Sequence, residues 1–197
     1  MLLLVRHGES AANAEATLLG RRESPLTERG RRQLDALAAL LAARHVDRLV
    51  ASPLGRARES AERLGLGLPV EVDERWIEVD YGELEGMGLG AVPAELWTAW
   101  RADPAFEPPG GESLAAVGAR VRGACDELFA CPGEGARGDG DVVVVSHVSP
   151  IKAAVAWALG VGDEVAWRMQ LFTASITRVG WGASGPALLG FNEAPPT

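Results

Sequence analysis

Two short apolar runs constrain the fold of this chain more than any other feature. Residues 2–5 and 142–145 are unbroken runs of leucine and valine, and each run ends two positions before a histidine, His7 and His147. An apolar run without alternation is typical of a strand that is buried on both faces. In open α/β sheets, ligands bind at the carboxyl ends of such strands. Both histidines are therefore expected at a binding edge.

Helical and strand patterns alternate along the rest of the chain. Leucines recur at helical spacing after Thr27, a good N-cap, and Ser52 with Pro53 suits the start of a second helix. Ser113 is expected to cap a helix that ends near Phe129. The further expected strands are residues 48–51, 70–72, 172–179 and 186–191. This alternation predicts a three-layer α/β/α fold with a mostly parallel central sheet.

The chain has no linker-like charge run, so residues 1–197 are expected to form one domain. An excursion over about residues 86–112 is rich in proline and is expected to form a lid, with a helix near 93–102. Its Trp97 and Trp100 either pack the excursion itself or form an apolar wall for a substrate. Residues 132–141 are rich in glycine and are expected to form a surface loop.

Composition narrows the classes of function. The net charge of −8 argues against a nucleic-acid partner, and no run approaches the roughly 20 apolar residues that a membrane helix needs. With only Cys125 and Cys131 and no leader pattern, a reduced cytoplasmic protein is expected, with the cysteines in packing or incidental roles. No paired Cys or His spacing suggests a metal site. An acidic protein can still bind a small anion through local arginines; the candidates are Arg6, Arg21, Arg22 and Arg56.

A cluster of cationic and imidazole side chains is expected where the strands end. If the strands that precede them are neighbours, Arg6, His7, Arg56 and His147 meet in one pocket. Guanidinium groups match the geometry of phosphate oxygens, and an imidazole can attack phosphorus. Taken singly, each residue also has a purely structural explanation.

Six fragments in order carry a resemblance to a known family. RHGES (6–10), SPLTERG, SPLGRARESA, IEVDYGELEG, GGES and VVSH together resemble the histidine phosphatase superfamily, also called the phosphoglycerate mutase-like family. The resemblance implies that His7 is a nucleophile that takes the phosphoryl group, with Arg6, Arg56 and His147 around the phosphate oxygens. It further implies that Glu78 is the general acid and that Asn13 lines the pocket. Glu83 and Glu85 are rivals of Glu78, although the resemblance gives Glu85 a positional role.

The resemblance leaves several alternatives open. Only 25 residues (86–110) separate the glutamate segment from GGES, with Arg101 as their one basic residue, which favours a phosphatase over a cofactor-dependent mutase. A non-catalytic module that binds a phosphorylated ligand is a third reading. Val148 stands where the family often has glycine after the second histidine.

The expected activity is hydrolysis of a small phosphomonoester, with no metal or cofactor and a mildly acidic optimum because the leaving alkoxide needs a proton. A homodimer through the sheet edge near the last strands is compatible with the sequence but not required by it.

Overall fold

The computed structural model describes residues 1–129, 140–182 and 185–194. Cys131 and most of the expected surface loop at 132–141 lie outside the described residues. The elements, in chain order, are β1 (Leu2–Arg6), α1 (Ala11–Ala14), α2 (Glu28–Leu41), β2 (Val46–Ala51), α3 (Gly55–Arg63), β3 (Val70–Val72), η1 (Glu74–Trp76), η2 (Gly82–Leu84), η3 (Leu89–Ala91), α4 (Ala94–Ala102), α5 (Leu114–Phe129), β4 (Asp141–Ser146), α6 (Val148–Leu159), η4 (Asp163–Arg168), β5 (Ile176–Gly182) and β6 (Gly185–Glu193).

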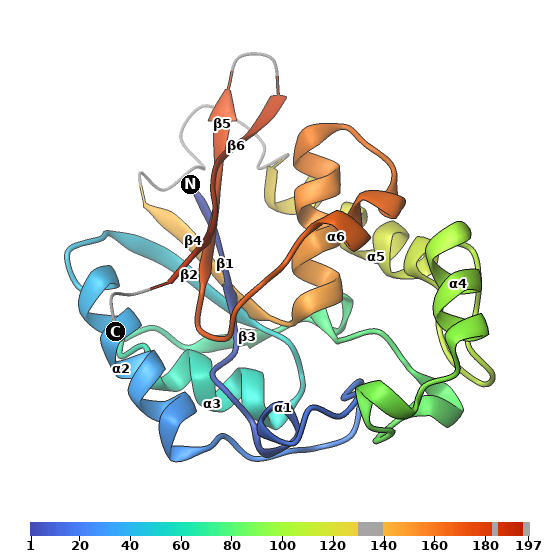
Figure 1. Cartoon of the computed structure of the whole chain (residues 1–197). Coiled ribbons are helices and arrows are strands. Elements are labelled where there is room, and N and C mark those ends of the chain that lie inside the picture. The colour runs from blue at the N-terminus through green and yellow to red at the C-terminus, as the bar shows by residue number, and fades with distance from the viewer. Residues whose placement is uncertain (130–139, 183–184, 195–197) are drawn as a thin grey trace.

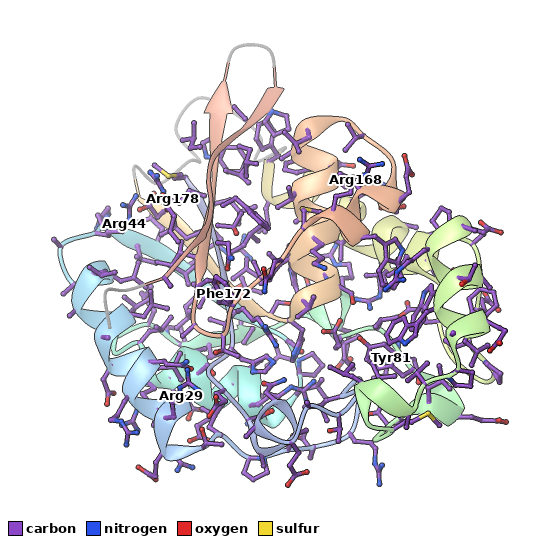
Figure 2. All side chains as sticks on the ribbon, in the orientation of Figure 1. Arg29, Arg44, Tyr81, Arg168, Phe172 and Arg178 are labelled. Atoms are coloured by element: carbon purple, nitrogen blue, oxygen red, sulfur yellow. The ribbon has the colours of Figure 1, made fainter. Side chains whose placement is uncertain are left out.

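One six-stranded sheet with helices on both faces confirms the predicted α/β/α architecture. The strand order is β3-β2-β4-β1-β5-β6, in which the first four strands run parallel and β5 and β6 run antiparallel to their neighbours. In Figure 1, α2 and α3 cover one face of the sheet, and α5 and α6 cover the other. Figure 2 shows side chains filling the space on both sides of the sheet.

The alternation of side chains along β1 explains its unbroken apolar run. Leu2 and Leu4 belong to the core under α5 and α6, while Leu3 and Val5 belong to the core under α2 and α3. Successive residues of a strand point to opposite faces, so a strand covered on both faces needs apolar residues throughout. Burying each such side chain contributes about 1.5–3 kcal/mol, which holds the end of the strand in place.

The two central strands end at the same level. Residues of β1 and β4 pair from Leu2 with Val142 to Arg6 with Ser146, so His7 and His147 follow at equal height. After β1 the chain leads through α1 to α2, which packs on one face of the sheet, and α6 after β4 packs on the other. Adjacent parallel strands whose connections leave to opposite faces open a crevice at their carboxyl ends. The topology thus places the crevice between the two histidines.

Several local predictions are confirmed, and one is wrong. Thr27 caps α2 through Gly30 N at 3.0 Å, and Ser113 accepts from Ala116 N at 3.2 Å at the start of α5. The predicted cap at Ser52 is wrong: α3 begins at Gly55 after Leu54, which makes no side-chain cap bond. Ser52 lies two residues too early, because the chain first passes through the turn that contains Pro53.

Strand boundaries also differ from the expected ones. The fifth strand begins at Ile176 rather than at residue 172, because residues 172–175 form the turn that leads into the sheet: Ala174 has a φ of 52°. The polar segment after β1 contains the short helix α1, which no periodicity indicated. No helix among the described residues is long and apolar enough to cross a membrane.

A third apolar cluster lies outside the two cores of the sheet. It is built around Leu18, Leu84, Val92, Trp100 and Leu114, with Trp97 and Trp167 packed against it. The excursion over residues 86–112 contributes α4 to this cluster, and this helix lies where the sequence predicted one. Residues from three distant parts of the chain therefore meet beside the crevice.

Candidate active site

The glycine after His7 is required by the turn that follows β1. A Cβ added at Gly8 would lie 2.7 Å from the backbone oxygen of Gly30 and 2.9 Å from Leu34 Cδ1. These contacts are closer than a Cβ tolerates, so the turn packs against α2 only with glycine at this position. Gly8 N also donates to Ser60 Oγ at 3.2 Å. The end of β1 is therefore held on both sides.

The imidazole of His7 is oriented by its own backbone neighbour. Nδ1 lies 2.7 Å from the carbonyl oxygen of Gly8, and a carbonyl can only accept, so Nδ1 carries the hydrogen. Burial, followed by the charges of Arg6 and Arg56, holds the pKa of His7 well below its usual value. The ring is therefore neutral near pH 7, with a lone pair on Nε2.

His147 lies beside His7, with the ring centroids 5.0 Å apart. Its Nε2 is 2.7 Å from Ser52 Oγ, and its buried Nδ1 has no partner among the described residues. Burial lowers the pKa of His147, as do the neighbouring His7 and arginines. In the neutral tautomer in which Ser52 donates to Nε2, Nδ1–H is a donor without an acceptor.

The two predicted arginines are anchored by backbone oxygens. Arg6 Nη1 donates to Leu171 O at 2.6 Å, and Arg56 donates to Gly20 O at 2.6 Å and to Arg22 O at 2.9 Å. The Nε atoms of both arginines are buried without a partner among the described residues. Burial lowers the pKa of each guanidinium, and the nearby Glu78 opposes that shift.

Glu78 is buried at the amino end of α6. Its Oε1 accepts from Val79 N at 2.8 Å and from Ser149 N at 3.1 Å, and its Oε2 accepts from Val148 N at 3.0 Å. The donors of Val148 and Ser149 are free because the first N–H groups of a helix have no partner within the helix. The contact with Glu78 uses the backbone N–H of residue 148, so valine at this position provides it as well as glycine would.

The remaining predicted residues occupy supporting positions. Asn13 uses Oδ1 to accept from Ser10 N at 3.1 Å in the capping box of α1, which leaves its amide nitrogen as the group able to face a ligand. Arg21 pairs with Asp80 and Glu112, so its charge is directed to those carboxylates. Arg22 donates to Glu85 O at 3.3 Å, and its main contribution is the carbonyl that holds Arg56.

Two glutamates support the cluster from outside. Glu85 accepts from Gly20 N at 2.8 Å and from Arg21 N at 3.2 Å, which fixes the loop whose carbonyls hold Arg56. Glu112 binds Arg120, and Arg120 donates in turn to Glu78 O at 3.4 Å. Glu83, the other rival of Glu78, is exposed.

Sequence reasoning missed three side chains near this site. Ser52, expected as a helix cap, is the partner of His147. Trp167 joins Trp97 and Trp100 across 70 and 67 residues of chain. Lys152 and these three tryptophans line one cavity, and the only signal of Lys152 in the sequence is that no other lysine exists in the chain.

The cluster can bind and attack a phosphate group. Neutral Nε2 of His7 is a nucleophile, and the unpartnered donors of Arg6, Arg56 and His147 are suited to anionic oxygens. No group of three or more His, Cys, Asp or Glu side chains that could hold a metal ion occurs in the part of the chain that the structure describes.

Comparison with known proteins places the chain among related sequences. The family described as "Histidine phosphatase superfamily (branch 1)" matches residues 2–194. A bifunctional protein of Mycobacterium tuberculosis is 38% identical over 190 residues, which cover 93% of this chain and 51% of that protein. The chain thus spans about half the length of the first curated relatives it matches.

Two further relatives bear on the activity. A probable phosphoglycerate mutase of Cronobacter sakazakii is 35% identical, over 92% of this chain and 87% of that protein. The solved structure of a mycobacterial glucosyl-3-phosphoglycerate phosphatase in complex with VO3 matches with a TM-score of 0.86 and 34% identity, covering 98% of both chains.

Proposed function

The chain belongs to the histidine phosphatase superfamily (branch 1), and we propose that it hydrolyses a small phosphomonoester through a phosphohistidine on His7. One observation carries this proposal. A neutral imidazole with a lone pair on Nε2 lies among buried N–H donors of Arg6, Arg56 and His147 that have no partner among the described residues. Buried donors without acceptors are costly, and a phosphate group would satisfy them.

The first step transfers the phosphoryl group to the protein. The Nε2 lone pair of His7 attacks phosphorus while the bond from phosphorus to the ester oxygen breaks. Protonated Glu78 gives its proton to that oxygen, so the alcohol leaves neutral. An alkoxide is a poor leaving group, and such proton transfer contributes roughly 10²–10⁴-fold to rate.

The second step returns the protein to its starting state. The Glu78 carboxylate removes a proton from a water molecule, whose oxygen attacks phosphorus. The bond from phosphorus to Nε2 breaks, inorganic phosphate leaves, and Glu78 is again protonated. One residue thus serves as acid and then as base.

Arginine and histidine donors supply the positive charge that this reaction needs. The transition state of phosphoryl transfer spreads negative charge over the equatorial oxygens of phosphorus. Preorganised cationic donors in a buried site stabilise that charge without reorganising. We therefore propose that no metal ion takes part, because Arg6 and Arg56 occupy the role of the metal ions used by other phosphoryl-transfer enzymes.

A mutase is the second candidate, because one relative carries that name. A mutase must hold a second anionic group of its substrate while the phosphoryl group stays on the histidine. The excursion over residues 86–110 offers Arg101 alone for this purpose, and that guanidinium packs against Trp97 and Trp167. The phosphatase is therefore favoured. A module that binds without turnover is disfavoured because nucleophile, arginines and acid are all present.

The first test is phosphate release from 4-nitrophenyl phosphate in excess EDTA. The second mixes the protein with a ³²P-labelled substrate, stops the reaction rapidly and measures the label on the protein. Release that EDTA does not reduce, together with a label on the protein that is lost in acid and kept in alkali, is the expected result. Release that stops in EDTA would overturn metal independence. Conversion of one phosphoglycerate isomer to the other, without phosphate release, would instead identify a mutase.

A further inference from the structure

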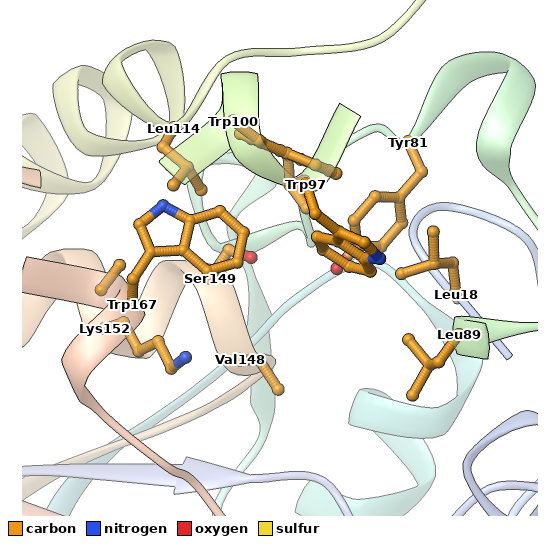
Figure 3. A pocket seen from close by; sticks show the side chains of 12 residues that line it. Leu18, Tyr81, Leu89, Trp97, Trp100, Leu114, Val148, Ser149, Lys152 and Trp167 are labelled. Atoms are coloured by element: carbon orange, nitrogen blue, oxygen red, sulfur yellow. The ribbon is translucent and has the colours of Figure 1, made fainter. Parts of the chain in front are cut away.

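We call the group of Arg6, His7, Arg56 and His147 the phosphate cluster. A cavity of about 280 Å³ with aromatic walls, the aromatic cavity, adjoins it. Trp97 and Trp100 stack with ring centroids 5.9 Å apart, and Trp167 packs edge-on against both. The ring of Tyr81 packs edge-on against Trp100 on the other side. Figure 3 shows these rings around the cavity. Flat aromatic walls favour a ligand that presents a flat apolar face.

The cavity begins where Glu78 is held. Val79, Val148 and Ser149 line the cavity, and the backbone N–H of each donates to the Glu78 carboxylate. The proton that Glu78 gives in the proposed reaction goes to the oxygen that joins phosphorus to the leaving alcohol. A phosphate on His7 therefore directs the rest of the alcohol into this cavity.

Lys152 is the one cationic residue of the cavity lining. It follows Val148 and Ser149 by four and three residues on α6, so it lies on the same face of the helix. Figure 3 shows its amino group below the Trp167 ring, directed towards the space between that ring and Val148. In the described part of the chain, Lys152 makes no hydrogen bond or ion pair, and the lining contains no Asp or Glu.

The surroundings of Lys152 leave its charge unmatched. Burial lowers the pKa of the Lys152 amine, and Arg6 lowers it further, while Glu78 acts in the opposite direction. The cavity therefore offers one cation without a partner among the described residues, and a ligand that fits it supplies an anionic group.

We propose, on the basis of the function inferred above, that this cavity selects phosphomonoesters whose alcohol part carries both a ring with a flat apolar face and a carboxylate. The ring packs against Trp97 and Trp167, which the buried Trp100 supports from behind, and the carboxylate pairs with Lys152. Lys152 is the only lysine among the 19 lysine and arginine residues of the chain. Its flexible stem allows the ammonium group to meet carboxylates at several positions on a ring.

The kinetic test compares the three isomeric carboxyphenyl phosphates with the matched carbamoylphenyl phosphates, which have the same shape without the charge. We expect the wild type to prefer at least one carboxylate over its amide by about tenfold in kcat/KM, as for a charge-assisted hydrogen bond. Lys152→Met should abolish that preference, and Lys152→Arg should retain part of it. An unchanged preference in Lys152→Met, or none in the wild type, would overturn the proposal.

The ring contact is tested separately by the ratio of kcat/KM for phenyl phosphate to that for ethyl phosphate. Trp97→Leu and Trp167→Leu should each lower this ratio about fivefold, through loss of aromatic contact. Trp157→Leu is the matched control, because Trp157 packs against Phe129 outside the cavity and should leave the ratio unchanged. Equal ratios in the wild type and the three variants would show that the rings do not contribute to the choice of substrate.

A binding measurement separates failure of this inference from failure of the proposed function. Protein with ¹⁵N-labelled lysine gives one side-chain signal, which is titrated with 4-carboxybenzylphosphonate and with benzylphosphonate. A shift caused by the first compound alone supports the cavity assignment, even if no phosphate ester is hydrolysed. Hydrolysis with no Lys152 shift by either compound would leave the phosphatase standing and overturn the carboxylate site.

Discussion

The phosphate cluster and the aromatic cavity touch each other, yet they are built by opposite means. The cluster consists of Arg6, His7 and His147 at the ends of β1 and β4, joined by Arg56 of α3. Backbone oxygens hold the two arginines and His7, and Ser52 Oγ holds His147. The cavity walls are rings from two distant segments, the excursion and η4. These segments meet in the third apolar cluster. The reacting groups thus depend on the sheet, whereas selection of the alcohol depends on packing outside it.

Loss of the nucleophile should give the largest effect and separate the two regions most sharply. His7→Ala removes the proposed acceptor of the phosphoryl group, so kcat should fall roughly 10⁴-fold or more for every substrate. Steady-state phosphate release measures this. His45→Ala is the control, because the side chain of His45 is 76% exposed, and its kcat should match the wild type. Near-normal turnover by His7→Ala would disprove the phosphohistidine mechanism.

Glu78 lies at the junction of the two regions, so its replacement should act through the leaving group. Glu78→Gln keeps the shape and one acceptor but cannot supply the proton. We expect kcat to fall roughly 10²–10⁴-fold for ethyl phosphate. For 4-nitrophenyl phosphate, whose leaving group needs little protonation, the loss should be much smaller. An equal loss for both esters would assign Glu78 to positioning rather than to proton transfer.

Ser52 tests how firmly the cluster depends on neighbouring strands. Ser52→Ala removes the partner of His147 Nε2, and kcat/KM should fall about tenfold, as for one lost hydrogen bond. Ser113→Ala removes a helix cap instead, so it should lower the free energy of unfolding by about 1 kcal/mol. Its kcat/KM should stay within twofold of the wild type. The same kinetic loss in both variants would point to general destabilisation.

The smallest expected effect is a dependence of stability on pH. The pKa of His7 is lowered in the folded state, so the unfolded chain binds more protons below about pH 6.5. Stability is therefore complete above that pH and falls with acidification, by at most about 1.4 kcal/mol per pH unit for one histidine. Urea unfolding at pH 7.5 and pH 5.5 measures the fall, which should be smaller in His7→Asn.

The lowered pKa of His7 also affects activity. The nucleophile stays neutral well below the usual range of histidine, so the acid limb of kcat/KM should lie below pH 6.5. An acid limb at or above that pH would show that His7 is protonated in the working enzyme and would contradict the electrostatic account of the site.

The structure-forming parts of the site were the most predictable ones. The apolar runs before His7 and His147 can form little else than buried strands, and the register of β1 with β4 then brings their ends level. The order of the six fragments identified the family, which the comparisons confirm. Helix caps at Thr27 and Ser113 followed from local hydrogen bonding alone.

The contacts that hold the site residues in place could not be predicted from local sequence patterns. A serine before proline suggests a helix cap, but only the pairing of β2 with β4 brings Ser52 to His147. Glu85 and Gly20 are 65 residues apart. Lys152 is 71 residues from Tyr81 and 55 from Trp97, so no sequence period could join the residues of the cavity.

The sequence by itself determined the fold class, the family and the residues that meet at the strand ends, because each follows from periodicity or a contiguous motif. Only the tertiary structure decided which donors lack partners, where Lys152 points and which rings form one wall. Those properties depend on burial and on distances between segments far apart in the chain. Burial is a property of the whole packed molecule, and no single stretch of residues carries it.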